Sequence, residues 1–93
     1  MYRMKKSPRQ LERYFKGVSN HRRIQILDLV YKNPGISLQA IAATLDANEK
    51  TISEHTRRLK EAGLIYKTYQ GNVVCHNLSP YGEKIHKFLV NFE

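Results

Sequence analysis

Hydrophobic residues in the first third of the chain recur at intervals of three and four, the spacing of one face of a helix. Ser7-Pro8 supplies a capping side chain and a proline suited to the first helical position, and Gln10 completes a capping box. A second helix begins at Asn20 and stops at Asn33-Pro34-Gly35. The two apolar stripes comprise Leu11, Tyr14, Phe15 and Val18, and then Ile24, Leu27 and Tyr31.

The middle of the chain shows two further stripes, separated by a short polar break. After one extended residue, Ile36, the side chain of Ser37 caps a short helix. Asp46-Ala47-Asn48 ends that helix in a tight turn, because Asp and Asn tolerate the left-handed conformation and Asn48 can cap a new helix. A longer helix then runs from about residue 49 to residue 62, just before Gly63. The short helix carries the apolar residues Leu38, Ile41, Ala42 and Leu45.

The last third predicts a β-hairpin followed by a helix. Residues 64–69 and 73–78 are rich in Ile, Val, Tyr and Thr, and Gly71-Asn72 between them is a two-residue hairpin signal. The hairpin forms a wing over about residues 66–77. Ser79-Pro80 repeats the capped start, and a helix follows over residues 80–92. Its stripe, which needs a partner surface, comprises Tyr81, Ile85, Phe88, Leu89 and Phe92.

The order helix, helix, short strand, helix, helix, hairpin, helix predicts a mainly α fold with a small β-hairpin wing, the winged helix-turn-helix. Ninety-three residues suit one domain, residues 1–93, without room for a separate ligand-binding domain. Residues 1–6 are expected to form a basic, disordered arm. We expect no cofactor, and the sequence gives no sign of a small-molecule ligand.

The helix over residues 49–62, hereafter the recognition helix, predicts a DNA-reading surface. At about 100° per residue, Ile52, His55, Thr56 and Leu59 fall on one side of it. Short hydroxyls and longer charged groups fall on the outward side, where they suit base edges and phosphates of a major groove. The outward residues are Lys50, Thr51, Ser53, Glu54, Arg57 and Arg58. Further candidate DNA contacts are Ser37 and Gln39 on the short helix, and Lys67, Tyr69, Gln70 and Asn72 in the wing.

The charge of the chain favours nucleic acid as the partner. Sixteen Lys and Arg residues stand against eight Asp and Glu, a formal net charge of +8. Residues 1–23 hold eight of the basic residues and only one acidic residue, Glu12. The recognition helix is therefore expected to select the site, while residues 1–23 supply much of the affinity or form only a solubilising surface.

Several classes of protein are excluded by residue type. The single cysteine, Cys75, forms no internal disulfide, and zinc fingers of the CxxC kind are ruled out. Residues 1–6 lack the apolar continuation of a signal peptide, and no segment has the length of a membrane span, so we expect a cytoplasmic protein. The chain has no paired-carboxylate cleft, phosphate-binding glycine loop or nucleophile motif, so no enzyme activity is expected.

The residues in and around the recognition helix resemble those of ArsR-type winged-helix repressors. The resemblance covers about residues 14–78, and residues 78–82 look more like the corresponding junction of MarR-type and archaeal regulators. It rests on Asn20 to Leu27 and on Ala42, Leu45, Thr51, Ile52, Ser53, His55, Leu59 and Glu61 to Ile65. The resemblance implies a homodimer on a pseudo-palindromic operator, with recognition helices about 34 Å apart. The implied dimer contacts are Leu11, Tyr14, Phe15, Tyr81, Ile85, Phe88, Leu89 and Phe92.

The sequence departs from that family at five places. Asp46 stands where a turn glycine is usual, and Ala47 and Thr56 replace larger aliphatic residues, which predicts thinner or shifted packing beneath the recognition helix. The wing tip lacks an arginine for the minor groove. The metal-binding cysteines of many members are absent from residues 37–41. Glu83 and His86 alone, at spacing i, i+3, do not make a metal site.

Some residues leave two interpretations open. Glu54 can accept a hydrogen bond from a cytosine amino group or pair with Arg58 four residues later. His55 is favoured as a packed structural residue over a base contact. Cys75 is favoured as a packed side chain over a thiol sensor. For the whole chain, the alternatives to a sequence-specific regulator are a winged-helix module for protein interaction and an architectural nucleic-acid binder without sequence preference.

Overall fold

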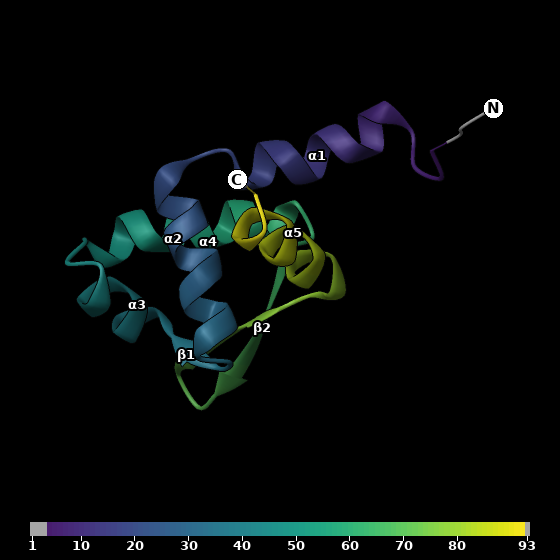
Figure 1. Cartoon of the computed structure of the whole chain (residues 1–93). Helices are drawn as coiled ribbons and strands as arrows, with labels where there is room; N and C mark the ends of the chain where they lie inside the picture. The colour runs from purple at the N-terminus through teal and green to yellow at the C-terminus, as the bar shows by residue number, and fades with distance from the viewer. Residues whose placement is uncertain (1–3, 93) are drawn as a thin grey trace.

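The computed structural model describes residues 4–92, and its helices and strands follow the predicted order (Figure 1). The mainly α fold with a β-hairpin wing is confirmed. Helix α1 lies across one end of the molecule, and the hairpin projects at the opposite end (Figure 1). The elements are α1 (Pro8–Val18), α2 (His21–Lys32), β1 (Ile36–Ser37), α3 (Leu38–Thr44), α4 (Glu49–Glu61), β2 (Ile65–Gln70), β3 (Val73–Leu78) and α5 (Pro80–Val90).

Side-chain caps fix the start of each helix, as the sequence predicts. The Ser7 hydroxyl accepts from the Gln10 N–H at 3.2 Å, and the Gln10 side chain accepts from the Ser7 N–H at 2.9 Å. Asn20, Ser37, Asn48 and Ser79 cap the other four helices. Two helices end slightly earlier than expected, because Ala62 caps α4 and Asn91 caps α5, which leaves Phe92 beyond the last helix.

The predicted lone extended residue, Ile36, is part of a third strand. Strand β1 pairs antiparallel with β3, with Ile36 opposite His76 and Ser37 opposite Cys75. The sheet therefore has the order β1-β3-β2, and β3 is its central strand. Pairing with β1 fixes the wing against the start of α3.

The central position of β3 explains why adjacent residues on it are both buried. Neighbouring strand residues point to opposite faces, and both Cys75 and His76 are nevertheless buried. Nδ1 of His76 lies 2.9 Å from the Ile36 carbonyl oxygen, which makes Nδ1 the protonated nitrogen of a neutral ring. Burial lowers the pKa of His76 and so favours that neutral form. The expectation that Cys75 is a packed side chain agrees with its placement.

The hydrophobic core joins α2 and α3 to the inward side of α4, which is the recognition helix. Ile26 and Leu27 of α2, Ile41 of α3, and Ile52 and Leu59 of α4 are fully buried. Removing the side chain of any one of them would leave a cavity, which typically costs about 2–5 kcal/mol. The orientation of α4 is therefore set by side chains from two other helices.

The chain between α4 and β2 holds α5 by close backbone contact. The Ser79 hydroxyl donates to the Gly63 carbonyl at 2.6 Å, and the Ser79 N–H donates to the Leu64 carbonyl at 3.0 Å. A Cβ atom added at Gly82 would overlap with the Leu64 carbonyl oxygen. Gly82 is thus required because the first turn of α5 rests directly on another backbone segment.

A second contact attaches α5 to α2. Nε2 of the buried His86 lies 2.9 Å from an Asp28 carboxylate oxygen, and the His86 ring stacks on Tyr31 with the centroids 4.0 Å apart. Asp28 also pairs with Lys32 at 2.9 Å. The hydrogen bond from His86, followed by that from Lys32, lowers the pKa of Asp28.

The predicted basic arm lies partly outside the described residues, which begin at Met4 and so exclude Arg3. Within the described part, the ammonium group of Lys6 lies 4.5 Å from the centre of the Tyr81 ring, a cation–π distance. Lys6 is therefore placed against α5. Among residues 4–92, no helix combines the length and the apolar composition needed to span a membrane.

We predict that Gly82→Ala lowers the free energy of unfolding by about 1–3 kcal/mol, the usual effect of inserting a methyl group where there is no space. This loss outweighs the helix propensity of Ala, which exceeds that of Gly by about 1 kcal/mol. Urea denaturation followed by circular dichroism measures the change. Lys84→Ala, at an exposed position of the same helix, is the control and should be nearly neutral. A Gly82→Ala protein as stable as the wild type would contradict the contact.

Candidate nucleic-acid interface

Helices α3 and α4 form the helix-turn-helix, and the turn between them has a defined geometry. Asp46 adopts the left-handed conformation, with φ at 50°, as expected where a turn glycine is usual. The Ala47 N–H donates to the Ala42 carbonyl at 2.9 Å, and the Asn48 side chain accepts from the Lys50 N–H at 2.7 Å. The residues that follow Asn48 are therefore held at a fixed angle to α3.

The inward side of α4 is fully packed. Ile52, Thr56 and Leu59 have no exposed surface. The Thr56 hydroxyl donates to the Ser53 carbonyl at 3.0 Å, so a polar group is accommodated where an aliphatic one was expected. Thr56 therefore leaves no exposed gap on this side of the helix.

His55 lies half-buried at the edge of this packed side, in agreement with the structural role predicted for it. Its Nδ1 atom is buried and has no hydrogen-bond partner within residues 4–92. Burial, followed by the charges of Arg23 and Arg22, lowers the pKa of His55. The neutral ring is thus the favoured form beside two arginines.

The outward side of α4 presents the predicted side chains to solvent. Lys50, Thr51, Glu54, Arg57 and Arg58 are exposed, and Ser53 is half-buried. The helix carries four basic and three acidic side chains, so its surface is only weakly positive. The first two turns present Lys50 and the two hydroxyls, and the last two present the arginines.

Glu54 is held by the two arginines that follow it. It accepts two hydrogen bonds from Arg57, one of them at 3.0 Å, and a third from Nε of Arg58 at 3.3 Å. Arg57 also donates to Glu61 at 2.8 Å and so lies between two carboxylates. Hydrogen bonding to Arg57 is the main reason that the pKa of Glu54 is lowered. Of the two interpretations left open, the structure has the pairing with arginine, and Arg57 is a partner in addition to Arg58.

The two candidates at the start of α3 have different surroundings. The Ser37 hydroxyl accepts from the Ala40 N–H at 3.1 Å and is therefore engaged as a cap. Gln39 is exposed in the first turn of α3, and its side chain makes no hydrogen bond to another described residue. Gln39 is the more available of the two.

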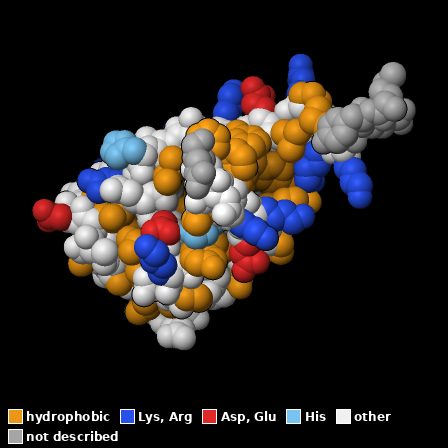
Figure 2. Space-filling view, in the orientation of Figure 1, with side chains coloured by type: hydrophobic (Ala, Val, Ile, Leu, Met, Phe, Trp, Pro, Cys, Tyr) orange, Lys and Arg blue, Asp and Glu red, His pale blue; other side chains and the backbone are white. Residues whose placement is uncertain are grey.

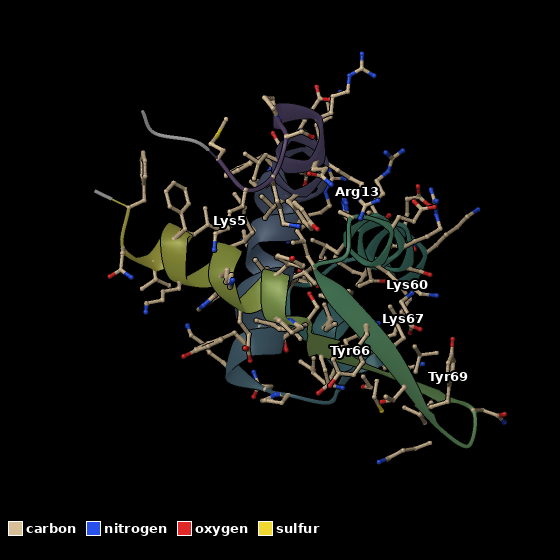
Figure 3. All side chains as sticks on the ribbon, turned by 90° about the vertical axis from the view of Figure 1, so that its right-hand side faces the viewer. Lys5, Arg13, Lys60, Tyr66, Lys67 and Tyr69 are labelled. Atoms are coloured by element: carbon tan, nitrogen blue, oxygen red, sulfur yellow. The ribbon has the colours of Figure 1, made fainter. Side chains whose placement is uncertain are left out.

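The wing places basic and aromatic groups beside α4 (Figure 3). Tyr69, Gln70 and Asn72 are exposed near its tip, and Tyr69 is 67% exposed. Lys67 is half-buried, and its pKa is lowered by burial and then by Lys60 and Arg57. Lys60 lies on the wing side of α4, near Lys67, so the two lysines form one positive region (Figure 3). Lys60 was not among the DNA contacts predicted from the sequence, although its spacing from Arg57 would have placed it on that flank.

The predicted dimer residues form an apolar surface over α1 and α5 (Figure 2). The Phe15 and Phe88 rings meet edge to face, 6.2 Å apart, and Phe92 lies 5.7 Å from Phe88. These three phenylalanines are exposed, and we call them the phenylalanine patch. Leu11, Ile85 and Leu89 are half-buried around it, Tyr14 is buried, and Tyr81 is partly exposed and packs on Tyr14.

Within residues 4–92, no three His, Cys, Asp or Glu side chains are grouped so that they could hold a metal ion. Of the pair at i, i+3 on the last helix, His86 is engaged with Asp28 and Glu83 is exposed.

Comparison with known proteins gives a consistent result. The sequence pattern of winged helix-turn-helix DNA-binding domains matches residues 19–66. HlyU from Vibrio cholerae N16961 is 24% identical, with a TM-score of 0.83 over 92% of this chain and 94% of that chain. The homodimeric winged helix-turn-helix DNA-binding domain of Mb0332 from Mycobacterium bovis is 28% identical, with a TM-score of 0.76 over 95% and 84%. No curated protein matches the chain.

A regulator of the ArsR family shares this fold. The ArsR family transcriptional regulator RHA00566 has a TM-score of 0.75 over 94% of this chain and 90% of that chain, at 19% identity. An identity this low supports the fold. The likeness of residues 78–82 to MarR-type regulators stays a prediction.

We predict that Glu54→Gln strengthens binding to duplexes of arbitrary sequence, because it releases Arg57 and Arg58 for phosphates. The logarithmic dependence of affinity on salt should steepen by about 1, the change expected for one added phosphate contact. Fluorescence anisotropy over a salt series measures both quantities. Glu49→Gln, which removes the same charge from the same helix without freeing an arginine, is the control. An equal effect of the two substitutions would contradict the interpretation.

Proposed function

The chain belongs to the winged helix-turn-helix DNA-binding family, and from this premise we propose that it is a sequence-specific, homodimeric transcriptional regulator acting on double-stranded DNA. The observation that carries the proposal is the contrast between the two sides of α4. Its inner side is fixed by core packing, and its outer side presents polar groups that the fold does not use. Such a rigid, polar helix suits insertion into a major groove.

Base reading belongs mainly to the first two turns of α4. Lys50, Thr51 and Ser53 carry donors and hydroxyls suited to base edges. In the free protein Glu54 pairs with Arg57 and Arg58, so the two arginines act chiefly on DNA phosphates. Glu54 contacts a base only after this pairing rearranges. Supporting contacts come from Ser37 and Gln39 on α3 and from Lys67, Tyr69, Gln70 and Asn72 on the wing.

A second copy of the chain covers the phenylalanine patch in this proposal. The patch is exposed and continuous between α1 and α5. Exposed apolar patches of this kind mark interfaces. The Mb0332 domain, 28% identical, is homodimeric. Pairing through α1 and α5 would place two recognition helices about one DNA turn, roughly 34 Å, apart.

The remaining parts of the proposal follow from the likeness to ArsR-type repressors. We expect repression as the effect, the cytoplasm as the location and no catalytic activity. Operator occupancy would then block transcription directly. The competing candidates, an architectural nucleic-acid binder and a protein-interaction module, differ in their response to DNA sequence.

Selection of bound duplexes from a random library tests the proposal, and we predict a pseudo-palindromic consensus. On that consensus, Lys50→Ala with Ser53→Ala should reduce the preference over scrambled duplex by about tenfold or more, because each good base contact contributes about 1–3 kcal/mol of discrimination. Lys84→Ala, exposed on α5, should leave the preference unchanged. Enrichment of no sequence would favour an architectural binder, and failure to bind any duplex would favour a protein-interaction module.

We also predict that Phe88→Glu separates the dimer. A charge at the centre of an apolar interface should weaken association by about 30-fold or more, since central aromatic residues commonly contribute at least about 2 kcal/mol. Sedimentation equilibrium measures the dissociation constant, and circular dichroism checks folding. Tyr69→Glu, an equally drastic change at an exposed wing residue, is the control. A monomeric wild type, or a dimer indifferent to Phe88→Glu, would rule out this interface.

A further inference from the structure

A basic groove lies between α1, α2 and α4, where the first two helices meet the recognition helix. It has a volume of about 250 Å³, which leaves room for a phosphate group and several waters of about 30 Å³ each. Arg13 and Lys16 border it from α1, Arg23 from α2 and Arg58 from α4, above a floor of Gly17 and Ala62. We call this the α1–α4 groove.

Close helix packing creates the floor of this groove. A Cβ atom added at Gly17 would overlap with the Ala62 side chain, so the end of α1 rests directly on the end of α4. Small residues on both sides bring the helices together, while the long basic side chains remain around the contact. The arrangement places four cations around one depression.

The cations of the groove are poorly balanced by carboxylates. The only acid that borders it, Glu61, is hydrogen-bonded to Arg57. Lys16 and Arg58 have exposed partners, at 3.4 Å and 3.3 Å. In the described part of the chain, Arg13 and Arg23 form no ion pair, and the buried Nε atom of Arg23 has no hydrogen-bond partner. Arg13 and Arg23 are thus the two cations of the groove that no described carboxylate balances.

The start of α2 adds to this imbalance. His21, Arg22 and Arg23 occupy its first turn, and no acidic residue does. Cations at the positive end of a helix oppose its dipole. Arg22 has a structural partner, because it donates to the Leu45 carbonyl at 3.2 Å. The Arg23 side chain has no such partner among the described residues. Its position therefore weakens the helix but suits the binding of an external anion.

The groove lies beside the recognition helix, on the flank opposite the wing. Arg58 is about 100° around α4 from Arg57, while Lys60 is about 60° away on the other flank. Figure 3 shows Arg13 reaching toward α4 from α1, whereas Lys60 and Lys67 lie on the wing side. A duplex that follows the outer face of α4 would therefore meet basic groups on both flanks.

We propose that the α1–α4 groove binds a backbone phosphate of duplex DNA, with Arg13 and Arg23 as its ligands and Arg58 connecting it to the recognition helix. This inference rests on the proposed function, since it requires DNA on the outer face of α4. A phosphate in the groove would balance the unpaired guanidinium charge of Arg23 and complement the start of α2. It carries no sequence information but fixes the register of the protein on DNA.

Arg13→Gln with Arg23→Gln tests the site, and Lys84→Gln with Lys87→Gln is the control that removes equal charge from α5. Affinity is measured over a salt series on the selected and the scrambled duplex, after circular dichroism has verified folding. For the groove variant, the logarithmic salt dependence should decrease by about 1, and affinity should fall by a similar factor on both duplexes. Sequence preference should persist.

Methylphosphonate substitution identifies the phosphate itself. At one flanking position, removing the phosphate charge should weaken the wild type and the α5 control but leave the groove variant unaffected. Equal salt dependence for the groove variant and the α5 control would overturn the proposal. So would the failure of every methylphosphonate position to distinguish the wild type from the groove variant. A third result would also overturn it. In that result, inorganic phosphate stabilises the wild type but not the groove variant, while the two proteins have the same salt dependence of DNA binding. Absence of any sequence preference in the wild type would instead refute the proposed function. The difference in salt dependence between the groove variant and the α5 control would still test the groove.

Discussion

The backbone between α4 and β2 is the constraint on which the molecule depends. Leu64 is fully buried, and its N–H donates to Leu59 at the end of the recognition helix. Its carbonyl accepts from Ser79, and Gly82 and Gly17 lie close to this segment from α5 and α1. The recognition helix, the wing and both terminal helices thus meet within three residues. A displacement of one of them must be shared by the others, because the close approach of backbones and small side chains leaves no space to absorb it.

Local chemistry explains why the order of the elements is predictable from sequence. Each helix begins at a side chain that can cap it, and the hairpin turns at a Gly-Asn pair suited to positive φ. The outward residues of the recognition helix follow from helical geometry once its ends are known. Asp46 in the left-handed conformation shows that even a departure from the usual glycine is interpretable from residue type.

Contacts between distant residues could not be predicted in the same way. The pairing of Ile36 with His76 spans forty residues, and the contact of His86 with Asp28 spans fifty-eight. Both depend on where the core places whole elements, and sequence spacing carries no such information. The α1–α4 groove could not be predicted from the sequence for the same reason, because Arg13, Arg23 and Arg58 come from three different helices. Their excess charge was visible in the sequence, but their meeting point was not.

The carboxylates of the recognition helix have a consequence for the behaviour of the protein among many binding sites. A genome offers on the order of 10⁶–10⁹ competing non-specific positions for every operator. Because Glu54 and Glu61 occupy Arg57, the helix attracts phosphates less strongly than its arginines alone would. For the regulator proposed above, fewer molecules would then be sequestered on DNA without an operator, and a smaller number of copies per cell would keep the operator occupied.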